Sequence, residues 1–279
     1  MRAWWFVLGG MVVLVSPRFF AASVTTAFQS GAQGGVIVKA HINGAGPFRL
    51  LLDTGATHSA ITEDIVEAAG ARAVARTIVL SATGDAVRAV ASLDRLEVGP
   101  IVRENILPSI APRSAFGEGI HGLIGQDVLS TLRYTLDFKR RTVEWHDAKS
   151  LPAGPALRLA LEHGRFLVAL PQGATTLRMV PDSGAGSLVL FREFLTASDT
   201  SGTVELSTAD GVVSGRRLRL RELQIGNRTL RDLAAVHVDR PDRHPAEGDG
   251  LLPLHLFESV TFDGPGRQLI LGRMRGPAS

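Results

Sequence analysis

One pattern, which occurs twice, constrains this chain more than any other feature. An apolar run from Leu50 to Leu52 leads into Asp53-Thr54-Gly55-Ala56, and a second run from Leu177 to Val180 leads through Pro181 into Asp182-Ser183-Gly184-Ala185. In each copy a strand-like segment delivers a carboxylate into a turn that contains a hydroxyl residue and a glycine. We therefore expect Asp53 and Asp182 to face each other across two similar halves.

The repetition extends well beyond the two aspartates, which are 129 residues apart. Other landmarks recur at nearly the same distance: 126 residues for the turn at Ser81, 127 for the strand end at Gly99 and 128 for the apolar segment at Gly122. A nearly constant offset is what duplication of a structural unit leaves behind. Asp-Thr-Gly alone is a weak motif, but a second aspartate turn in the same register is far more specific.

The composition favours strands and turns over long helices. The chain has 279 residues, of which 45% are hydrophobic, with 30 Gly and 14 Pro. This length is sufficient for two lobes with a substantial core. We predict an all-β fold with short helices. A stretch with two prolines and a glycine at 147–155 marks the boundary between lobes at 30–148 and 155–273.

Local patterns predict individual elements. Residues 36–42 and 48–52 are typical of a hairpin that ends at Asp53, and a short helix with Thr62 as its N-cap should follow. A second, protruding hairpin turns at 81–85, and its counterpart turns at 209–211. Asp127 is interpreted as the N-cap of another short helix.

Residues 1–23 differ from the rest of the chain. Arg2 precedes an apolar run from Ala3 to Val15, and small residues follow at 21–23, which is typical of a signal peptide. The run is shorter than the roughly 20 apolar residues that span a bilayer. We predict export to the periplasm or the outside, with an uncleaved membrane anchor as the alternative and no other membrane contact.

The composition also disfavours several functions. The chain has no cysteine, which excludes thiol catalysis and thiolate metal sites. Its histidines occur singly, without a paired His-x-x-x-His, so we expect neither a metal nor another cofactor. The formal net charge of +3 falls to +1 once Arg2 and Arg18 leave with the predicted leader. Since the remaining arginines are interleaved with acids, we expect no binding to nucleic acid.

The repeated segments resemble the aspartic proteases, in particular the retropepsin-like branch found in bacteria. The matching features are the apolar run into Asp53-Thr54-Gly55-Ala56, a glycine-bearing hairpin similar to a flap, and Gly122-Leu123-Ile124-Gly125, which is similar to the segment threaded behind the catalytic loop. The resemblance implies a bilobal fold with two β-barrel-like lobes related by a pseudo-twofold axis. It also implies one catalytic aspartate from each lobe and a peptide or unfolded protein as substrate, bound in a cleft between them.

Paired carboxylates suit the hydrolysis of a peptide bond. Two close carboxylates cannot both ionise, so they share a proton, and aspartic proteases are the usual illustration of this coupling. The charged one takes a proton from water, and the protonated one donates to the substrate carbonyl. Beside the dyad Asp53 and Asp182, we expect the catalytic loops to be supported by Thr54, Gly55, Ser183 and Gly184, and more loosely by Ser59 and Ser187. Substrate contact at the flap is expected from Thr83, Gly84 and Asp85.

Two prolines depart from the family pattern in the second half. Pro181 directly precedes Asp182, where a strand residue with a free N–H is usual, and Pro253 stands where the first half has Gly125. They support an alternative to the peptidase, namely a catalytically inactive peptide-binding module with the same fold. Because one chain carries both aspartates, we expect a monomer.

Overall fold

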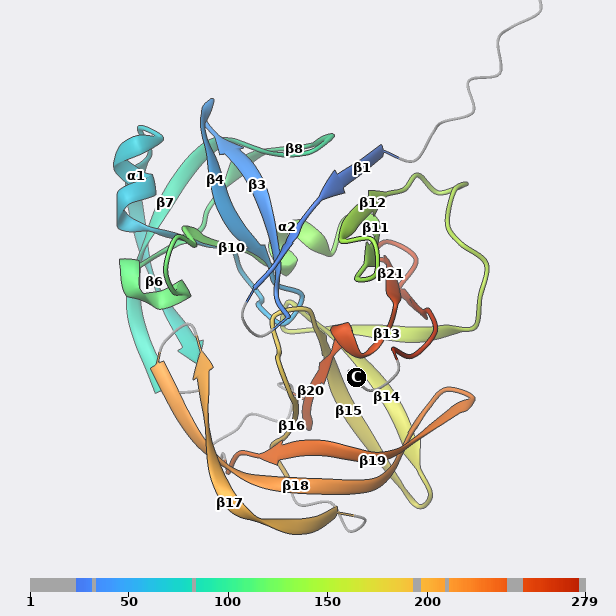
Figure 1. Ribbon diagram of the computed structural model, residues 1–279. Coiled ribbons are helices and arrows are strands. Elements are labelled where there is room, and N and C mark those ends of the chain that lie inside the picture. The colour runs from blue at the N-terminus through green and yellow to red at the C-terminus, as the bar shows by residue number, and fades with distance from the viewer. Residues whose placement is uncertain are drawn as a thin grey trace, which may run out of the picture.

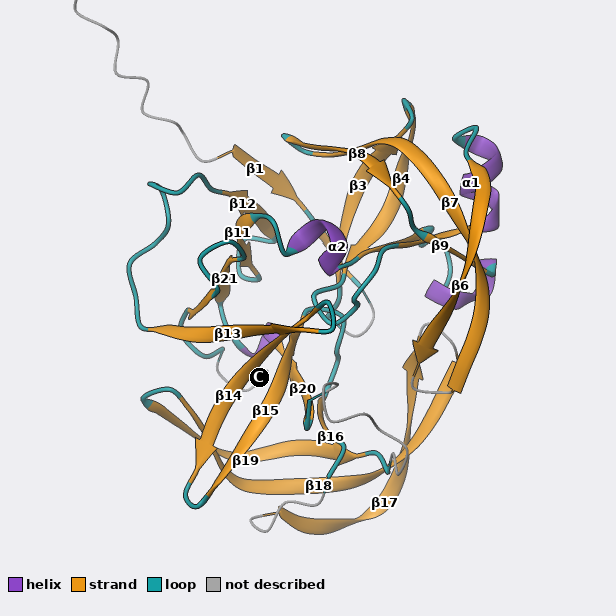
Figure 2. Ribbon diagram, turned by 180° about the vertical axis from the view of Figure 1, so that it is seen from behind, coloured by secondary structure: helices purple, strands orange, loops and turns teal. Residues whose placement is uncertain are grey.

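The molecule consists of two lobes of β-strands and a third group of strands that joins them. The computed structural model describes residues 24–31, 34–81, 84–192, 197–208, 211–239 and 248–275. Figure 1 shows the first lobe in blue to green and the second in yellow to orange, and the view from behind in Figure 2 shows how few helices accompany the strands. The predicted leader 1–23 lies outside the described residues.

The first lobe is one sheet with two short helices and a 3₁₀ turn. Strand β3 shows why it folds this way: Lys39 and His41 are exposed while the residues around them are buried, so alternate side chains enter the core. The elements of this lobe are β2 (Gln29–Ser30), β3 (Val36–Ile42), β4 (Ala45–Leu52), β5 (Ala60–Thr62), α1 (Glu63–Ala68), β6 (Arg72–Ser81), β7 (Gly84–Val98), β8 (Ile101–Ile106), β9 (Ser109–Ala111), η1 (Arg113–Phe116), β10 (Gly122–Ile124) and α2 (Gln126–Leu129).

The second lobe repeats the central pairings of the first. In the first lobe β4 pairs in parallel with β10, β10 is antiparallel to β5, and β5 is parallel to β9. The same sequence of directions joins β15, β20, β16 and β19. The elements are β14 (Arg165–Gln172), β15 (Thr175–Asp182), β16 (Leu188–Leu190), β17 (Ala197–Thr208), β18 (Gly211–Ile225), β19 (Arg228–His237), β20 (Gly250–Pro253) and η3 (Leu254–Leu256).

The two lobes share a sheet whose strands come from both halves of the chain. Its hydrogen-bonded order is β1, β12, β11, β21, β22, β13, and β13 continues this sheet into the second lobe. At its centre β11 pairs antiparallel with β21, so Tyr134 lies opposite Phe262 and their rings stack with centroids 5.2 Å apart. The bounds of these strands are β1 (Val24–Ala27), β11 (Arg133–Asp137), β12 (Thr142–Trp145), β13 (Ala156–Glu162), β21 (Ser259–Asp263) and β22 (Gln268–Leu271).

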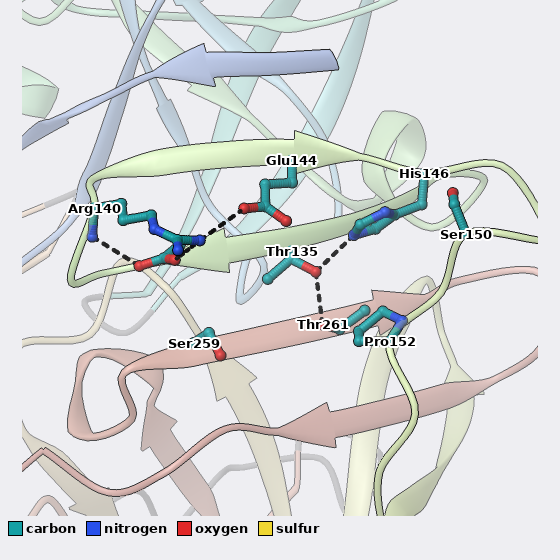
Figure 3. Close-up of a pocket in the computed structure, with 9 residues that line it drawn as sticks. Thr135, Arg140, Glu144, His146, Ser150, Pro152, Ser259 and Thr261 are labelled. Carbon is teal, nitrogen blue, oxygen red and sulfur yellow. Dashed lines mark hydrogen bonds and ion pairs between the residues drawn. The ribbon is translucent and has the colours of Figure 1, made fainter. Parts of the chain in front are cut away.

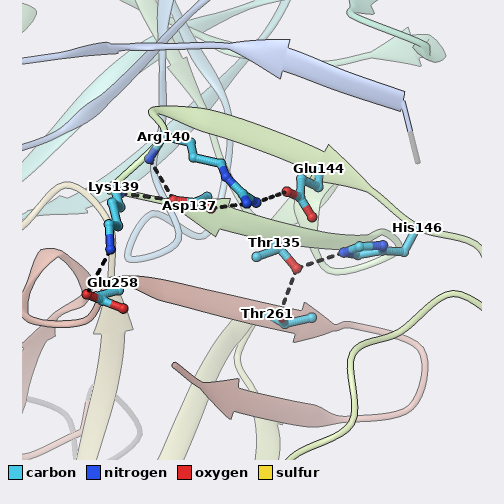
Figure 4. A network of polar contacts seen from close by, with 8 residues as sticks. All are labelled: Thr135, Asp137, Lys139, Arg140, Glu144, His146, Glu258 and Thr261. Carbon is cyan, nitrogen blue, oxygen red and sulfur yellow. Dashed lines mark hydrogen bonds and ion pairs between the residues drawn. The ribbon is translucent and has the colours of Figure 1, made fainter. Parts of the chain in front are cut away.

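One face of this interlobe sheet carries polar side chains around a hollow of about 410 Å³ (Figure 3). The hydroxyl of Thr135 contacts both His146 Nε2 and Thr261 Oγ1 at 2.7 Å, which links the two halves of the chain. Figure 4 shows a second link, the ion pair between Lys139 and Glu258, with its charged atoms 3.6 Å apart. None of the predicted site residues lines this hollow, so its polar groups serve the junction of the lobes.

A continuous hydrophobic cluster fills both lobes and the sheet between them. Phe138, Trp145 and Phe262 are among its buried aromatic residues. A smaller cluster around Val189, Val236 and Val238 lies beneath the second protruding hairpin.

The two predicted helix caps have different outcomes. Thr62 holds the N-cap position of α1 as predicted, although its hydroxyl donates to the carbonyl of His121 and makes no capping bond. Helix α2 begins at Gln126, so Asp127 lies within its first turn and Gly125 holds the cap position. Among the described residues, no helix is both long and apolar enough to cross a membrane.

Candidate active site

Asp53 and Asp182 stand at the ends of corresponding strands. Strand β4 ends at Leu52, and the backbone N–H of Asp53 continues its parallel pairing with β10 by donating to Ile124 O at 3.0 Å. Asp182 is the last residue of β15 and lies opposite Pro253 in the parallel pairing with β20. The central strands of each lobe therefore fix the direction in which each aspartate leaves the sheet.

Each carboxylate is held by the turn that follows it. Asp53 Oδ1 accepts hydrogen bonds from the backbone N–H groups of Gly55 and Ala56 at 2.9 and 3.1 Å. Asp182 Oδ1 accepts the equivalent bonds from Gly184 and Ala185 at 2.7 and 3.1 Å. In both loops one carboxylate oxygen is thus oriented by two backbone donors, which leaves the other available for chemistry.

The two carboxylates lie against each other's glycine turn. A Cβ atom added to Gly55 would fall 2.5 Å from Asp182 Oδ2, and one added to Gly184 would fall 3.3 Å from Asp53 Cγ. The lack of a side chain at Gly55 is therefore required for Asp182 to approach. The structure brings the two predicted catalytic aspartates together at the junction of the lobes.

Thr54 and Ser183 lock the two loops to each other. Thr54 Oγ1 accepts from the backbone N–H of Ser183 at 2.9 Å and donates to Pro181 O at 2.7 Å. Ser183 Oγ accepts from the backbone N–H of Thr54 at 3.1 Å and donates to Leu52 O. Both side chains are buried, so each of these bonds forms away from water and rigidly couples the loops.

Pro181 does not disturb this arrangement. Strand β15 runs through it to Asp182, and its carbonyl oxygen accepts the Thr54 hydroxyl. The backbone donors to Asp182 come from residues after the proline, so the missing N–H of Pro181 removes none of them.

The supports beneath the two loops differ. In the first lobe the buried Ser59 donates through both its backbone N–H and its hydroxyl to Asp127 Oδ1, at 2.9 and 2.8 Å, and its hydroxyl accepts from Gly125 N. Gln126 Nε2 also donates to Thr54 O at 2.8 Å. Asp127 is therefore an anchor for the catalytic loop, a role that its interpretation as a helix cap had missed.

The second lobe replaces these anchors with different residues. Pro253 begins a 3₁₀ turn where the first lobe has Gly125 and an α-helical turn. His255 occupies the position that corresponds to Asp127, and its ring lies near the backbone of Ala185. Burial lowers the pKa of His255, which favours the neutral ring.

Burial and mutual repulsion control the protonation of the dyad. Burial of the carboxyl group is the main cause that raises the pKa of Asp53. Burial, and secondarily the negative charge of Asp53, raise the pKa of Asp182 to about 7. Asp182 is buried, with 7% of the residue exposed, whereas Asp53 is half-buried. Because the groups are coupled, the pair titrates as a unit and keeps one proton up to near neutral pH.

Arg165 is a residue of this site that the sequence analysis missed. It is the first residue of β14 in the second lobe, and its Nε donates to Gly55 O in the first lobe at 3.0 Å. Its positive charge lowers the pKa of both aspartates, against the larger effect of burial. No local motif marks it, because the contact joins positions 110 residues apart.

The predicted flap residues are only partly visible. Thr83 lies outside the described residues, while Gly84 and Asp85 begin β7, opposite Ser81 and Leu80 of β6. The counterpart hairpin pairs Thr208 with Gly211. Both hairpins lie on the same side of the molecule in Figures 1 and 2. Within the described ranges, no three His, Cys, Asp or Glu side chains cluster as metal ligands.

Two strand-borne aspartate turns from pseudo-symmetric lobes, with their carboxylates in apposition, define the architecture of a bilobal aspartic protease. The comparisons agree with this classification. A family model described as aspartyl protease matches residues 38–128 and 169–274, so the chain belongs to that family.

The fold also has a similar counterpart among solved structures. The crystal structure of aspartic proteinase from Irpex lacteus superposes with a TM-score of 0.58 at 12% identity, covering 91% of this chain and 98% of that one. This likeness concerns the fold. No curated protein matches the sequence.

Proposed function

We propose that this chain is an exported aspartic endopeptidase that hydrolyses peptide bonds with a water activated between Asp53 and Asp182. The observation that carries the proposal is the apposition of two equally cradled carboxylates, in which Gly55 leaves room for Asp182 at a distance that no side chain would permit. Membership of the aspartyl protease family supports the same reaction.

The mechanism follows from the protonation of the pair. The charged carboxylate accepts a proton from the lytic water, and the protonated one donates to the carbonyl oxygen of the scissile bond, so that a neutral tetrahedral intermediate forms. Collapse of this intermediate returns a proton to the leaving amine and restores the shared proton of the dyad. Backbone donors and the Thr54–Ser183 lock hold both carboxylates in place, so little reorganisation is needed during the reaction.

The substrate is proposed to be an extended peptide or unfolded protein. We propose that the substrate contacts the two hairpins, β6–β7 and β17–β18, and that Gly84 and Asp85 lie near the tip of the first. An extended peptide can bind such hairpins by strand-like hydrogen bonding. One chain supplies both aspartates, which supports a monomer without a cofactor. Export is supported by the leader pattern in 1–23.

The test is cleavage of a diverse peptide pool from about pH 3 to 8 by the purified protein, beside Asp53→Asn and Asp182→Asn. We expect cleavage by the wild type and a loss of at least roughly 10³-fold in each variant, because the two groups act as a unit. A folded wild type that retains peptides without cutting them would favour the alternative, an inactive peptide-binding module. N-terminal sequencing of protein recovered from the periplasm tests export, and an intact Met1 there would contradict signal cleavage.

A further inference from the structure

The end of the β13–β14 hairpin packs on the catalytic loop of the other lobe. The hairpin turns at His163 and Gly164, which both have positive φ, and a Cβ added to Gly164 would lie 3.7 Å from Thr57, at ordinary packing distance. Arg165 follows at once, and its Nε donates to Gly55 O at 3.0 Å. A second-lobe guanidinium thus holds the very turn whose glycine faces Asp182.

Among the described residues of the first lobe, no side chain makes an equivalent contact. Strand β3 sets Val36 opposite Leu52, and continuing the register that pairs Val168 with Met179 sets Phe166 opposite Pro181. Because Leu52 and Pro181 precede the two aspartates, Val36 corresponds to Phe166, and Arg165 corresponds to Gly35. Glycine provides no side chain, so the pseudo-symmetric dyad has this guanidinium on one side only.

We propose that Arg165 is a positioning residue for the dyad: it fixes the Gly55 turn through its Nε–H and places a permanent positive charge beside both carboxylates. A guanidinium suits both tasks because it is charged at every relevant pH and its donors point in fixed directions. The proposal concerns a residue of the second lobe that acts on the first, and only its activity readout rests on the proposed function.

The charges around Arg165 are consistent with this role. Glu162, its cross-strand partner in β13, has its carboxylate bound to Arg178 of β15 at 2.5 Å. Asp127 of α2 is bound to Ser59 beneath the first loop, and His255 lies near Ala185 beneath the second. His58 of the first loop contacts its neighbour Thr57, and His163 lies in the hairpin turn itself.

The dyad is where the charge of Arg165 has its effect. Arg165 is the named positive charge that lowers the pKa of both Asp53 and Asp182. Removing it should therefore allow the carboxyl groups to keep their shared proton to a higher pH, and the alkaline limb of activity should move in the same direction.

The experiment compares Arg165→Met, Arg165→Lys and a matched control, Arg158→Met, which removes an exposed arginine of the neighbouring strand β13. Two quantities are measured from pH 3 to 9: the titration of the aspartate carboxyl carbons by NMR in ¹³C-labelled protein, and kcat/KM on a cleaved peptide. The NMR titration needs no turnover, so it decides the inference even if the protein proves to be a binding module.

For Arg165→Met we expect the dyad to titrate at higher pH and kcat/KM at its optimum to fall roughly tenfold, because a charged hydrogen bond to the loop is lost. Arg165→Lys should titrate close to the wild type, since it keeps the charge, while still losing activity because it lacks the fixed donor geometry. It also serves as the test if the methionine variant does not fold.

A dyad that titrates identically in wild type, Arg165→Met and Arg158→Met would overturn the inference. So would an Arg165→Lys protein whose dyad titrates like that of the methionine variant, because the charge would then not be the agent.

Discussion

The two catalytic loops reach the same geometry from different foundations. At the carboxylates the lobes are nearly interchangeable: each aspartate accepts two backbone donors from the next turn, and Thr54 and Ser183 exchange reciprocal bonds. Beneath the loops the likeness ends, because Ser59 and Asp127 anchor the first whereas His255 supports the second. The two lobes are thus alike where the two carboxylates lie together, and they differ in the residues directly beneath the loops.

The largest expected difference between the lobes concerns their glycine turns. A methyl group at Gly55 would enter the Asp182 carboxylate at 2.5 Å, whereas one at Gly184 would stand 3.3 Å from Asp53. We expect Gly55→Ala to reduce kcat by roughly 10²-fold or more through displacement of the dyad, and Gly184→Ala to cost much less. Steady-state kinetics on one peptide measures both.

A matched control for this pair is Gly31→Ala, because the added methyl would meet only ordinary contacts there, the nearest at 3.4 Å. Equal losses in Gly55→Ala and Gly184→Ala would show that the two turns are equally tight and would contradict the structural comparison.

A smaller difference is expected one layer below the loops. Ser59 is buried and its hydroxyl joins Asp127 to Gly125, so Ser59→Ala leaves buried partners unpaired and should lower the free energy of unfolding by about 1–3 kcal/mol. Among the described residues, the half-buried Ser187 hydroxyl has no hydrogen-bond partner, and Ser187→Ala should stay within about 0.5 kcal/mol. Urea unfolding at fixed pH measures both changes. A larger loss of stability for Ser187→Ala than for Ser59→Ala would contradict the assignment of Ser59 as the buried anchor.

The last comparison concerns the protonation of the dyad itself. Asp182 has a folded pKa of about 7, above its ordinary value of 3.8, so the folded state binds the proton more tightly than the unfolded state does. Stability should therefore fall as pH rises from about 4 to about 7. Peptidase activity should also decline through the upper end of this range, where the shared proton is lost.

Replacing either aspartate by the neutral asparagine should remove this loss of stability at high pH. At pH 8 we expect both Asp182→Asn and Asp53→Asn to raise the free energy of unfolding by about 1–2 kcal/mol, and at pH 4 to change it little. Parallel urea titrations at the two pH values measure the difference. A gain confined to one variant would show that the aspartates do not titrate as a pair.

Local sequence was sufficient for the parts of the fold and site that depend on short segments. The two aspartate turns, the alternation of β3 and the apolar segment at Gly122 are readable because neighbouring residues determine them. Strand β8 escaped prediction because most of its residues are only partly buried or exposed, which blurs the pattern.

Contacts across long separations were not readable in the same way. Asp127 resembles a helix cap when only its neighbours are considered, yet its carboxylate binds Ser59, 68 residues earlier. Arg165 looks like an ordinary residue after a turn, because its partner Gly55 is in the other lobe. Pro181 seemed to weaken the second loop, but the arrangement uses its carbonyl and never needs its N–H.

The order of strands in the interlobe sheet also determines when the two aspartates can meet during biosynthesis. Strand β1 at 24–27 can pair only after β12 at 142–145 has been synthesised. The centre of the sheet can form only after β21 and β22, which end at Leu271. Such long-range pairing closes late. Until this sheet closes, Asp53 and Asp182 have no fixed position relative to each other, so we expect the paired aspartate turns to form late in folding.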